Sequence, residues 1–171
     1  MTRRIVLRTD GAARGNPGPA GVGAVLEEGD TGRLLRELSA YVGSRTNNQA
    51  EYEALLLGLR AALEDEPAGP RPPPPPRVRA FLDSQLVVRQ LQGRYRVKDP
   101  ELAVLFAESR RLIERLAGFE CRHVPREQNQ RADELANEAI DAHLTLQGSL
   151  KASEPRLCKD PEGSPPTGGV Q

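Results

Sequence analysis

The chain has 171 residues, enough for one domain with a real hydrophobic core. Its 24 Lys and Arg balance its 24 Asp and Glu, so net charge neither indicates nor excludes a polyanionic partner. The two cysteines, Cys121 and Cys158, have no CxxC or Cys/His spacing, which argues against a zinc site and a disulfide framework. Apolar runs are too short for a signal peptide or membrane span, so we expect a cytoplasmic protein without a membrane partner.

The N-terminal part of the chain predicts three strands and a helix. β-branched and apolar residues from about Arg3 to Thr9 indicate the first strand. A turn rich in glycine and proline leads to a second strand from Val22 to Leu26, and a third runs from Leu34 to Val42. The short connections favour an antiparallel meander. Apolar residues three and four apart then predict an amphipathic helix from Asn48 to about Glu64.

A proline-rich stretch, residues 68–77, separates this part from the rest of the chain. Proline lacks the backbone donor and restrains its predecessor, so the stretch is predicted to be an extended connector. It is either a docking segment for an aromatic groove or a tolerated surface insertion, and we favour the insertion. A short strand, from Arg77 to Asp83, and a short helix are expected next.

The C-terminal part predicts a helix, a strand and a last helix. Asp99 is a good helix cap and is followed by proline at the first helical position. A strand is expected from Phe119 to Val124 and a helix from Gln130 to about Leu146. Residues 148–171 are rich in Gly, Pro and Ser, and we expect a disordered tail. The whole pattern predicts one domain over residues 1–147, an α/β fold with a mixed sheet flanked by helices.

Four acidic residues stand in separate local settings, namely Asp10, Glu51, Asp83 and Asp133. Asp10 and Asp83 follow predicted strands, whereas Glu51 and Asp133 fall in first turns of helices. Each has a local explanation, because Asp10 begins a turn dipeptide, Glu51 fits a capping pair with Asn48, and the other two suit helix starts. Brought together by a fold, however, the carboxylates would form a site for hard divalent cations.

Four segments, in order, resemble the type I ribonuclease H family: TDGAARGNPGPAGVGAVL, TNNQAEYEALLLGL, DSQLVV and HVPREQNQRADELANEA. The resemblance covers about Thr2 to His143. It implies a ribonuclease H-like fold with a mixed five-stranded sheet. It also implies an endonuclease that hydrolyses the RNA strand of RNA·DNA hybrids and leaves 5′-phosphate and 3′-hydroxyl ends.

The resemblance also implies the site. Asp10, Glu51, Asp83 and Asp133 would be the metal ligands, with Asp10 bridging two Mg²⁺ ions for which Mn²⁺ could substitute. His123 would be a proton shuttle or a product-release group. The alternative for His123 is a strand-end histidine with a structural hydrogen bond.

Substrate contacts are expected near the start of the first helix, from Gly11, Asn16, Asn48 and Gln49. Amide side chains can contact minor-groove edges and 2′-hydroxyls, although an asparagine there could equally cap the helix. The glycine-rich turn lacks the GxxxxGK[ST] and GxGxxG patterns, so we expect no nucleotide cofactor.

The chain departs from better-known family members in having no large basic insertion. A small basic cluster around Arg94 and Lys98 stands at the corresponding stretch. Its members could contact phosphates or could form a solvated turn, and we expect weak, salt-sensitive hybrid binding by a monomer. The alternatives are a non-catalytic module that binds hybrid or double-stranded RNA, a relative that cleaves double-stranded RNA, and a nuclease domain tied to reverse transcription or transposition.

Overall fold

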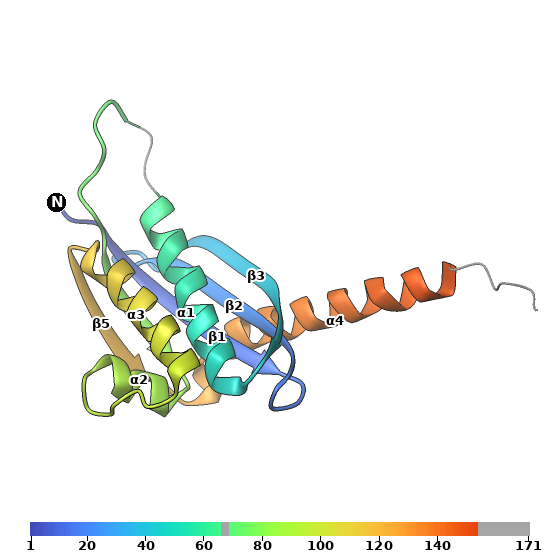
Figure 1. Ribbon diagram of the computed structural model, residues 1–171. Coiled ribbons are helices and arrows are strands. Elements are labelled where there is room, and N and C mark those ends of the chain that lie inside the picture. Colours follow the sequence, from blue (N-terminus) through green and yellow to red (C-terminus); the bar gives the residue numbers. More distant parts are fainter. Residues whose placement is uncertain (66–68, 154–171) are drawn as a thin grey trace, which may run out of the picture.

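The computed structural model describes residues 1–65 and 69–153 (Figure 1). Strands and helices follow one another in the order that the sequence predicts. In chain order they are β1 (Arg4–Ala13), β2 (Gly18–Glu28), β3 (Leu34–Arg45), α1 (Asn47–Glu64), β4 (Arg77–Leu82), α2 (Gln85–Leu91), α3 (Pro100–Glu114), β5 (Gly118–His123), the 3-10 turn η1 (Arg126–Gln128) and α4 (Gln130–Ser153).

The five strands form one mixed sheet in the order β3-β2-β1-β4-β5. The hairpins β1–β2 and β2–β3 are antiparallel, whereas β4 is parallel to β1 and β5 is parallel to β4. This confirms the predicted fold class. The last residues paired between β1 and β4 are Thr9 and Leu82, so Asp10 and Asp83 leave this ladder side by side.

One face of the sheet carries the main core. Figure 1 shows α1 and α3 side by side over it. Leu55 and Leu59 of α1 are fully buried with Ile5 and Leu7 of β1. The Tyr52 hydroxyl, buried in the same layer, donates a 2.7 Å hydrogen bond to Gln90 of α2. This layer fixes the start of α1 over the carboxyl end of β1.

The first part of α4 packs on the other face, against β1, β2 and β3. Two glycines of β2 allow the helix backbone to approach closely. A Cβ atom on Gly21 would lie 2.1 Å from the Ala136 carbonyl oxygen, and one on Gly23 would lie 2.2 Å from that of Ala132. Because only glycine leaves this space, Gly21 and Gly23 set the distance between the sheet and α4. They therefore also set the position of Asp133 over the sheet.

The structure corrects several predicted boundaries. The first strand does not end before Asp10: β1 continues to Ala13, because the antiparallel ladder with β2 extends to the Ala13–Ala20 pair. Asp10 therefore lies inside a strand and pairs with Gly23. The last helix does not end near Leu146 but continues to Ser153.

Two further predictions concern the connector and the tail. Residues 69–76 lie outside helices and strands, while 66–68 fall outside the described residues. Residues 154–171 also fall outside them, so the expected disorder of that stretch stays a prediction. Among the described helices, none combines the length and apolarity that crossing a membrane requires.

Candidate metal centre

Three carboxylates meet at the carboxyl end of the β1–β4 ladder. One oxygen each from Asp10, Glu51 and Asp83 lies within 4.8 Å of the other two. Asp10 is 3% exposed and Glu51 is 8% exposed, whereas Asp83 is half-buried directly after β4. The fold thus gathers acids that lie dozens of residues apart in the sequence, as predicted.

Gly11 brings Glu51 into this cluster. A Cβ atom at Gly11 would lie 2.2 Å from the backbone carbon of Ala50, so the first turn of α1 rests directly on β1. Glu51 follows Ala50 and reaches over the strand beside Asp10. Its Oε2 is buried and has no hydrogen-bond partner among the described residues.

The local explanations for Glu51 and Asp83 are wrong. α1 is capped by Thr46, whose hydroxyl accepts from the Gln49 backbone at 3.2 Å while the Gln49 side chain accepts from the Thr46 backbone at 2.8 Å. The hydroxyl of Ser84, not Asp83, caps α2. Because neighbouring polar residues already provide both caps, Glu51 and Asp83 are available to the cluster.

Asp133, in the first turn of α4, is a neighbour of Asp10 but is not part of the group of three carboxylates within 4.8 Å. Its Oδ1 accepts from Arg126 at 3.0 Å and from the Asn137 amide at 3.2 Å. Asn129 fixes this turn through two hydrogen bonds. Its side-chain amide donates to the Thr9 carbonyl at 2.8 Å, and its backbone carbonyl accepts from the Asp133 backbone at 3.2 Å.

Sequence reasoning missed three of these residues, namely Arg126, Asn129 and Asn137. Asn129 is 1% exposed, an unusual environment for an amide. Within HVPREQNQRADELANEA the sequence offered one signal, since a polar residue four positions before Asp133 and another four positions after it fall on the same side of a helix.

The crowding of negative charge changes how the carboxylates titrate. Burial, followed by the neighbouring Asp83 and Asp133, raises the pKa of Asp10 to about 8. The pKa of Glu51 is also well above its ordinary value, because of burial and then the charges of Asp10 and Asp83. Fully charged carboxylates in such a site require a compensating cation.

The donor set fits a hard divalent metal. All the gathered donors are carboxylate oxygens, which Mg²⁺ and Ca²⁺ prefer. The buried, unpartnered Oε2 of Glu51 is a donor that the described part of the protein leaves unused. The neighbouring charges also separate into two groups: Glu51 is influenced by Asp10 and Asp83, whereas Asp10 is influenced by both Asp83 and Asp133. Asp10 and Asp83 belong to both groups, whereas Glu51 and Asp133 each belong to one.

His123 is the exposed last residue of β5. Its Nε2 lies 3.1 Å from the backbone carbonyl oxygen of Asp83, so the ring is at the rim of the carboxylate cluster. The structural hydrogen bond that was considered as an alternative is therefore present. The same contact places a titratable ring next to a candidate ligand, so both interpretations of His123 stay open.

The predicted substrate residues fall into two places. Asn16, Asn48 and Gln49 stand at the start of α1, where the Asn16 side chain accepts from the Asn47 backbone at 3.0 Å. The Gln49 side chain also donates to Glu101 of α3. Neither Asn47 nor Asn48 caps the helix, because Thr46 does.

The basic cluster lies between α2 and α3. Arg94 and Lys98 are both exposed there. Arg94 lines a hollow of about 250 Å³ together with Arg89, Arg122 and His123, whereas Lys98 does not line it. Arg94 therefore shares a hollow with His123, the residue at the rim of the carboxylate cluster.

Comparison with known proteins identifies the family. Residues 8–139 match a family described as reverse transcriptase-like. Over 141 residues the chain is 44% identical to ribonuclease HI of Halobacterium salinarum, which covers 81% of this chain and 65% of the relative. The crystal structure of RNase H1 from this archaeon superposes with a TM-score of 0.74 at 42% identity, over 81% of this chain and 98% of that one. The chain belongs to the type I ribonuclease H family.

Two further ribonucleases H are similar. LC11-RNase H1, whose structure was solved in complex with an RNA/DNA hybrid, is 46% identical with a TM-score of 0.72, over 82% of this chain and 99% of that one. The N-terminal RNase H domain of Rv2228c from Mycobacterium tuberculosis is 38% identical with a TM-score of 0.73, over 80% of this chain and 98% of that one. The chain spans only 36% of the full bifunctional Rv2228c protein.

Proposed function

We propose that this chain is an endoribonuclease that hydrolyses the RNA strand of RNA·DNA hybrids with two Mg²⁺ ions. The observation that carries the proposal is the convergence of Asp10, Glu51 and Asp83 within 4.8 Å, with the buried Oε2 of Glu51 unused by the rest of the described protein. The hybrid bound to LC11-RNase H1 supports the choice of substrate. All the proposed ligands come from one chain, so the site is complete in a monomer.

The carboxylates would hold the ions in two groups. Asp10, Glu51 and Asp83 would serve the leaving-group side, and Asp10 with Asp133 the side of the attacking water. When bound, Mg²⁺ supplies an activated water on one side of phosphorus and stabilises the leaving oxygen on the other. Arg126 and Asn137 hold Oδ1 of Asp133, which orients the carboxylate for this task.

The remaining residues would bind the duplex and move protons. Asn48 and Gln49 lie where amide groups can contact 2′-hydroxyls, which distinguish RNA from DNA. Arg94 and Lys98 would add salt-dependent phosphate contacts. His123, beside Asp83, would accept or deliver a proton as the product leaves.

The test uses labelled RNA·DNA, RNA·RNA and DNA·DNA duplexes with Mg²⁺ or Mn²⁺, and an Asp10→Asn variant beside the wild type. We expect cleavage only of the RNA strand of the hybrid, with 5′-phosphate products, and no cleavage by the variant. Binding of the hybrid without cleavage by the wild type would indicate a non-catalytic module. Full activity of Asp10→Asn would refute the metal-site assignment.

A further inference from the structure

Part of the sheet has no described helix over it, and that part is rich in arginine. On the side where α4 packs against β1, β2 and β3, the strands β1, β4 and β5 present nine outward positions in three register rows, one of which, Arg8, lies beside the start of α4. We call these positions the arginine face. Its rows are Arg4, Arg77 and Gly118; Val6, Arg79 and Glu120; and Arg8, Phe81 and Arg122.

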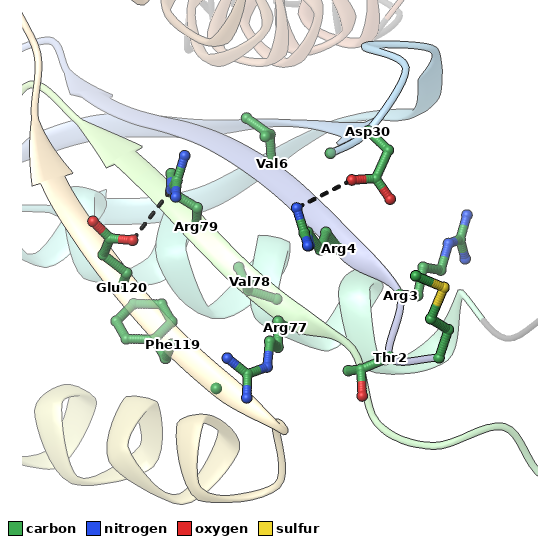
Figure 2. A pocket seen from close by; sticks show the side chains of 13 residues that line it. Thr2, Arg3, Arg4, Val6, Asp30, Arg77, Val78, Arg79, Phe119 and Glu120 are labelled. Carbon is green, nitrogen blue, oxygen red and sulfur yellow. Dashed lines mark hydrogen bonds and ion pairs between the residues drawn. The ribbon is translucent and has the colours of Figure 1, made fainter.

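A hollow of about 720 Å³ lies over the first two rows (Figure 2). Gly118 lines the hollow. A side chain at this position would contact Arg77, because a Cβ atom there would lie 3.4 Å from Cγ of Arg77. Figure 2 shows Arg4, Arg77 and Arg79 on this side of β1 and β4. The carboxylates of the metal centre do not line this hollow.

The charges of this face are poorly balanced. Arg4 and Arg77 are directly opposite on neighbouring strands, an arrangement of like charges that destabilises a sheet. Arg77 has no side-chain hydrogen bond or ion pair among the described residues. Glu120 is the only acid of the nine positions, and it is shared between Arg79, at 3.2 Å, and Arg122. Arg4 and Arg8 pair only with acids outside the nine positions, Asp30 at 3.3 Å and Glu27 at 3.9 Å.

The arginine face leads to the metal centre. Arg4, Val6 and Arg8 alternate with buried residues along β1, and the next residue on the same side of the strand is Asp10. On β5, Arg122 immediately precedes His123. Arg8 also donates to the Gln128 backbone carbonyl of η1 at 3.3 Å, so nucleic acid that extends beyond the carboxylate cluster would pass over η1 to reach this surface.

We propose that the arginine face binds a single strand of nucleic acid, namely the unpaired continuation of a hybrid held at the metal centre. Guanidinium groups bind phosphate in a bidentate manner. The three rows span about 13 Å along the strands and three strands span about 10 Å, which suits a few nucleotides of one strand. Val6 and the half-buried ring of Phe81, over which Arg8 lies at 4.8 Å, supply apolar contact in the middle of the array.

The continuation of a hybrid rests on the proposed function, whereas binding of a free strand does not. The first experiment therefore measures fluorescence anisotropy of a labelled 12-nucleotide DNA strand with the full chain in EDTA. The variant is Arg4→Ser/Arg77→Ser/Arg79→Ser. The control, Arg110→Ser/Arg111→Ser, removes two exposed charges from α3 on the opposite face of the sheet.

We expect the variant to bind the strand at least tenfold more weakly, and the control to bind like the wild type. Because the variant lacks three guanidinium groups that bind phosphate, the slope of log K against log salt should fall by about 2. The variant loses the ion pairs of Arg4 with Asp30 and of Arg79 with Glu120, but it also loses the repulsion between Arg4 and Arg77. Its melting temperature should therefore stay close to that of the wild type. Wild-type affinity in the variant would overturn the proposal. So would tight binding of an equally charged glutamate peptide where the strand does not bind, since the partner would then be an acidic protein.

The second experiment compares cleavage of a blunt hybrid with that of a hybrid carrying a 12-nucleotide single-stranded extension. The wild type should have a lower KM for the extended hybrid, and the variant should treat both alike while cleaving the blunt one normally. Equal KM values of the wild type for the blunt and the extended hybrid would overturn the proposal that the arginine face binds the unpaired continuation of the hybrid. If neither hybrid is cleaved but the variant still binds the free strand more weakly, the proposed function fails and the arginine face stands.

Discussion

Thr9 and Asn129 lie 120 positions apart in the sequence and are joined by a 2.8 Å hydrogen bond from the Asn129 amide to the Thr9 carbonyl. Each is adjacent to a candidate ligand. Thr9 precedes Asp10 in β1, and the carbonyl of Asn129 accepts from the Asp133 backbone. This bond therefore sets the spacing between the two carboxylates that we assign to the nucleophile side.

The first prediction follows from this bond. Asn129→Ala should lower the free energy of unfolding by about 1–3 kcal/mol, because a buried hydrogen bond is removed. It should also weaken Mg²⁺ binding measured by calorimetry and reduce hybrid cleavage by about tenfold or more. Gln128→Ala, at an exposed neighbouring position, is the control. Unchanged Mg²⁺ affinity in Asn129→Ala would show that the bond is structural alone.

The second prediction concerns stability without metal. Folded Asp10 keeps its proton up to a pKa of about 8, whereas the unfolded chain releases it near its ordinary value, so folding stability falls as pH rises between about 4 and 8. Asp10→Asn removes this penalty. In EDTA at pH 8 the variant should melt several degrees above the wild type, and this gap should shrink toward pH 4.

Mg²⁺ should reverse the order of the two melting temperatures. The cation offsets the crowded charge in the wild type, which should then gain more in melting temperature than Asp10→Asn does. Calorimetric scans with and without Mg²⁺ at each pH measure both effects. A metal-free wild type that becomes more stable from pH 5 to 8 relative to the variant would contradict the prediction.

The third prediction concerns the contact between α1 and β1. Gly11→Ala should lower stability by more than about 2 kcal/mol and reduce cleavage strongly, because the added methyl group displaces the turn that carries Glu51. Gly148→Ala is the matched control. Its Cβ meets nothing within 4 Å in α4, so it should stabilise the helix by about 0.5–1 kcal/mol and leave activity intact. A normal rate in Gly11→Ala would show that α1 can shift without moving Glu51.

The fourth prediction separates the two interpretations of His123. His123→Ala should reduce the cleavage rate without abolishing it, because a proton-carrying or product-release group is lost while the metal ligands remain. His123→Gln retains a hydrogen-bond donor for the Asp83 carbonyl but cannot carry a proton. If the glutamine variant recovers the wild-type rate, His123 serves only as a structural donor.

The order of elements could be predicted from the sequence, because periodic helices and β-branched runs carry their own signals. The local settings of the acids did not decide their role, and the gathering of Asp10, Glu51 and Asp83 was expected from the resemblance of four ordered segments to the ribonuclease H family. The depth of Asp10 within β1 could not be predicted, since it depends on pairing with Gly23 across the hairpin. The cap of α1 could not be chosen from the sequence, because Thr46 and Asn48 are both acceptable caps by type and only the backbone geometry selects Thr46.

Long-range register explains the other omissions. Asn129 gives no sign in the sequence that its amide will meet Thr9, and Arg4 and Arg77 become neighbours only through the parallel β1–β4 ladder. The α4 extension was missed for a different reason. Gly148 and the polar residues after it lower helix propensity, but a helix already anchored at Ile140 continues past them.

The length of α4 has a consequence for how this domain is joined to other parts of a protein. Ile140 is the last buried residue of the helix among those whose burial is described, and His143 still stacks on Tyr41 of β3. Beyond His143 the ribbon runs away from the sheet to Ser153 (Figure 1). At 1.5 Å per residue, these turns extend about 20 Å beyond Ile140. A module fused directly after Ser153 would therefore start well clear of the sheet.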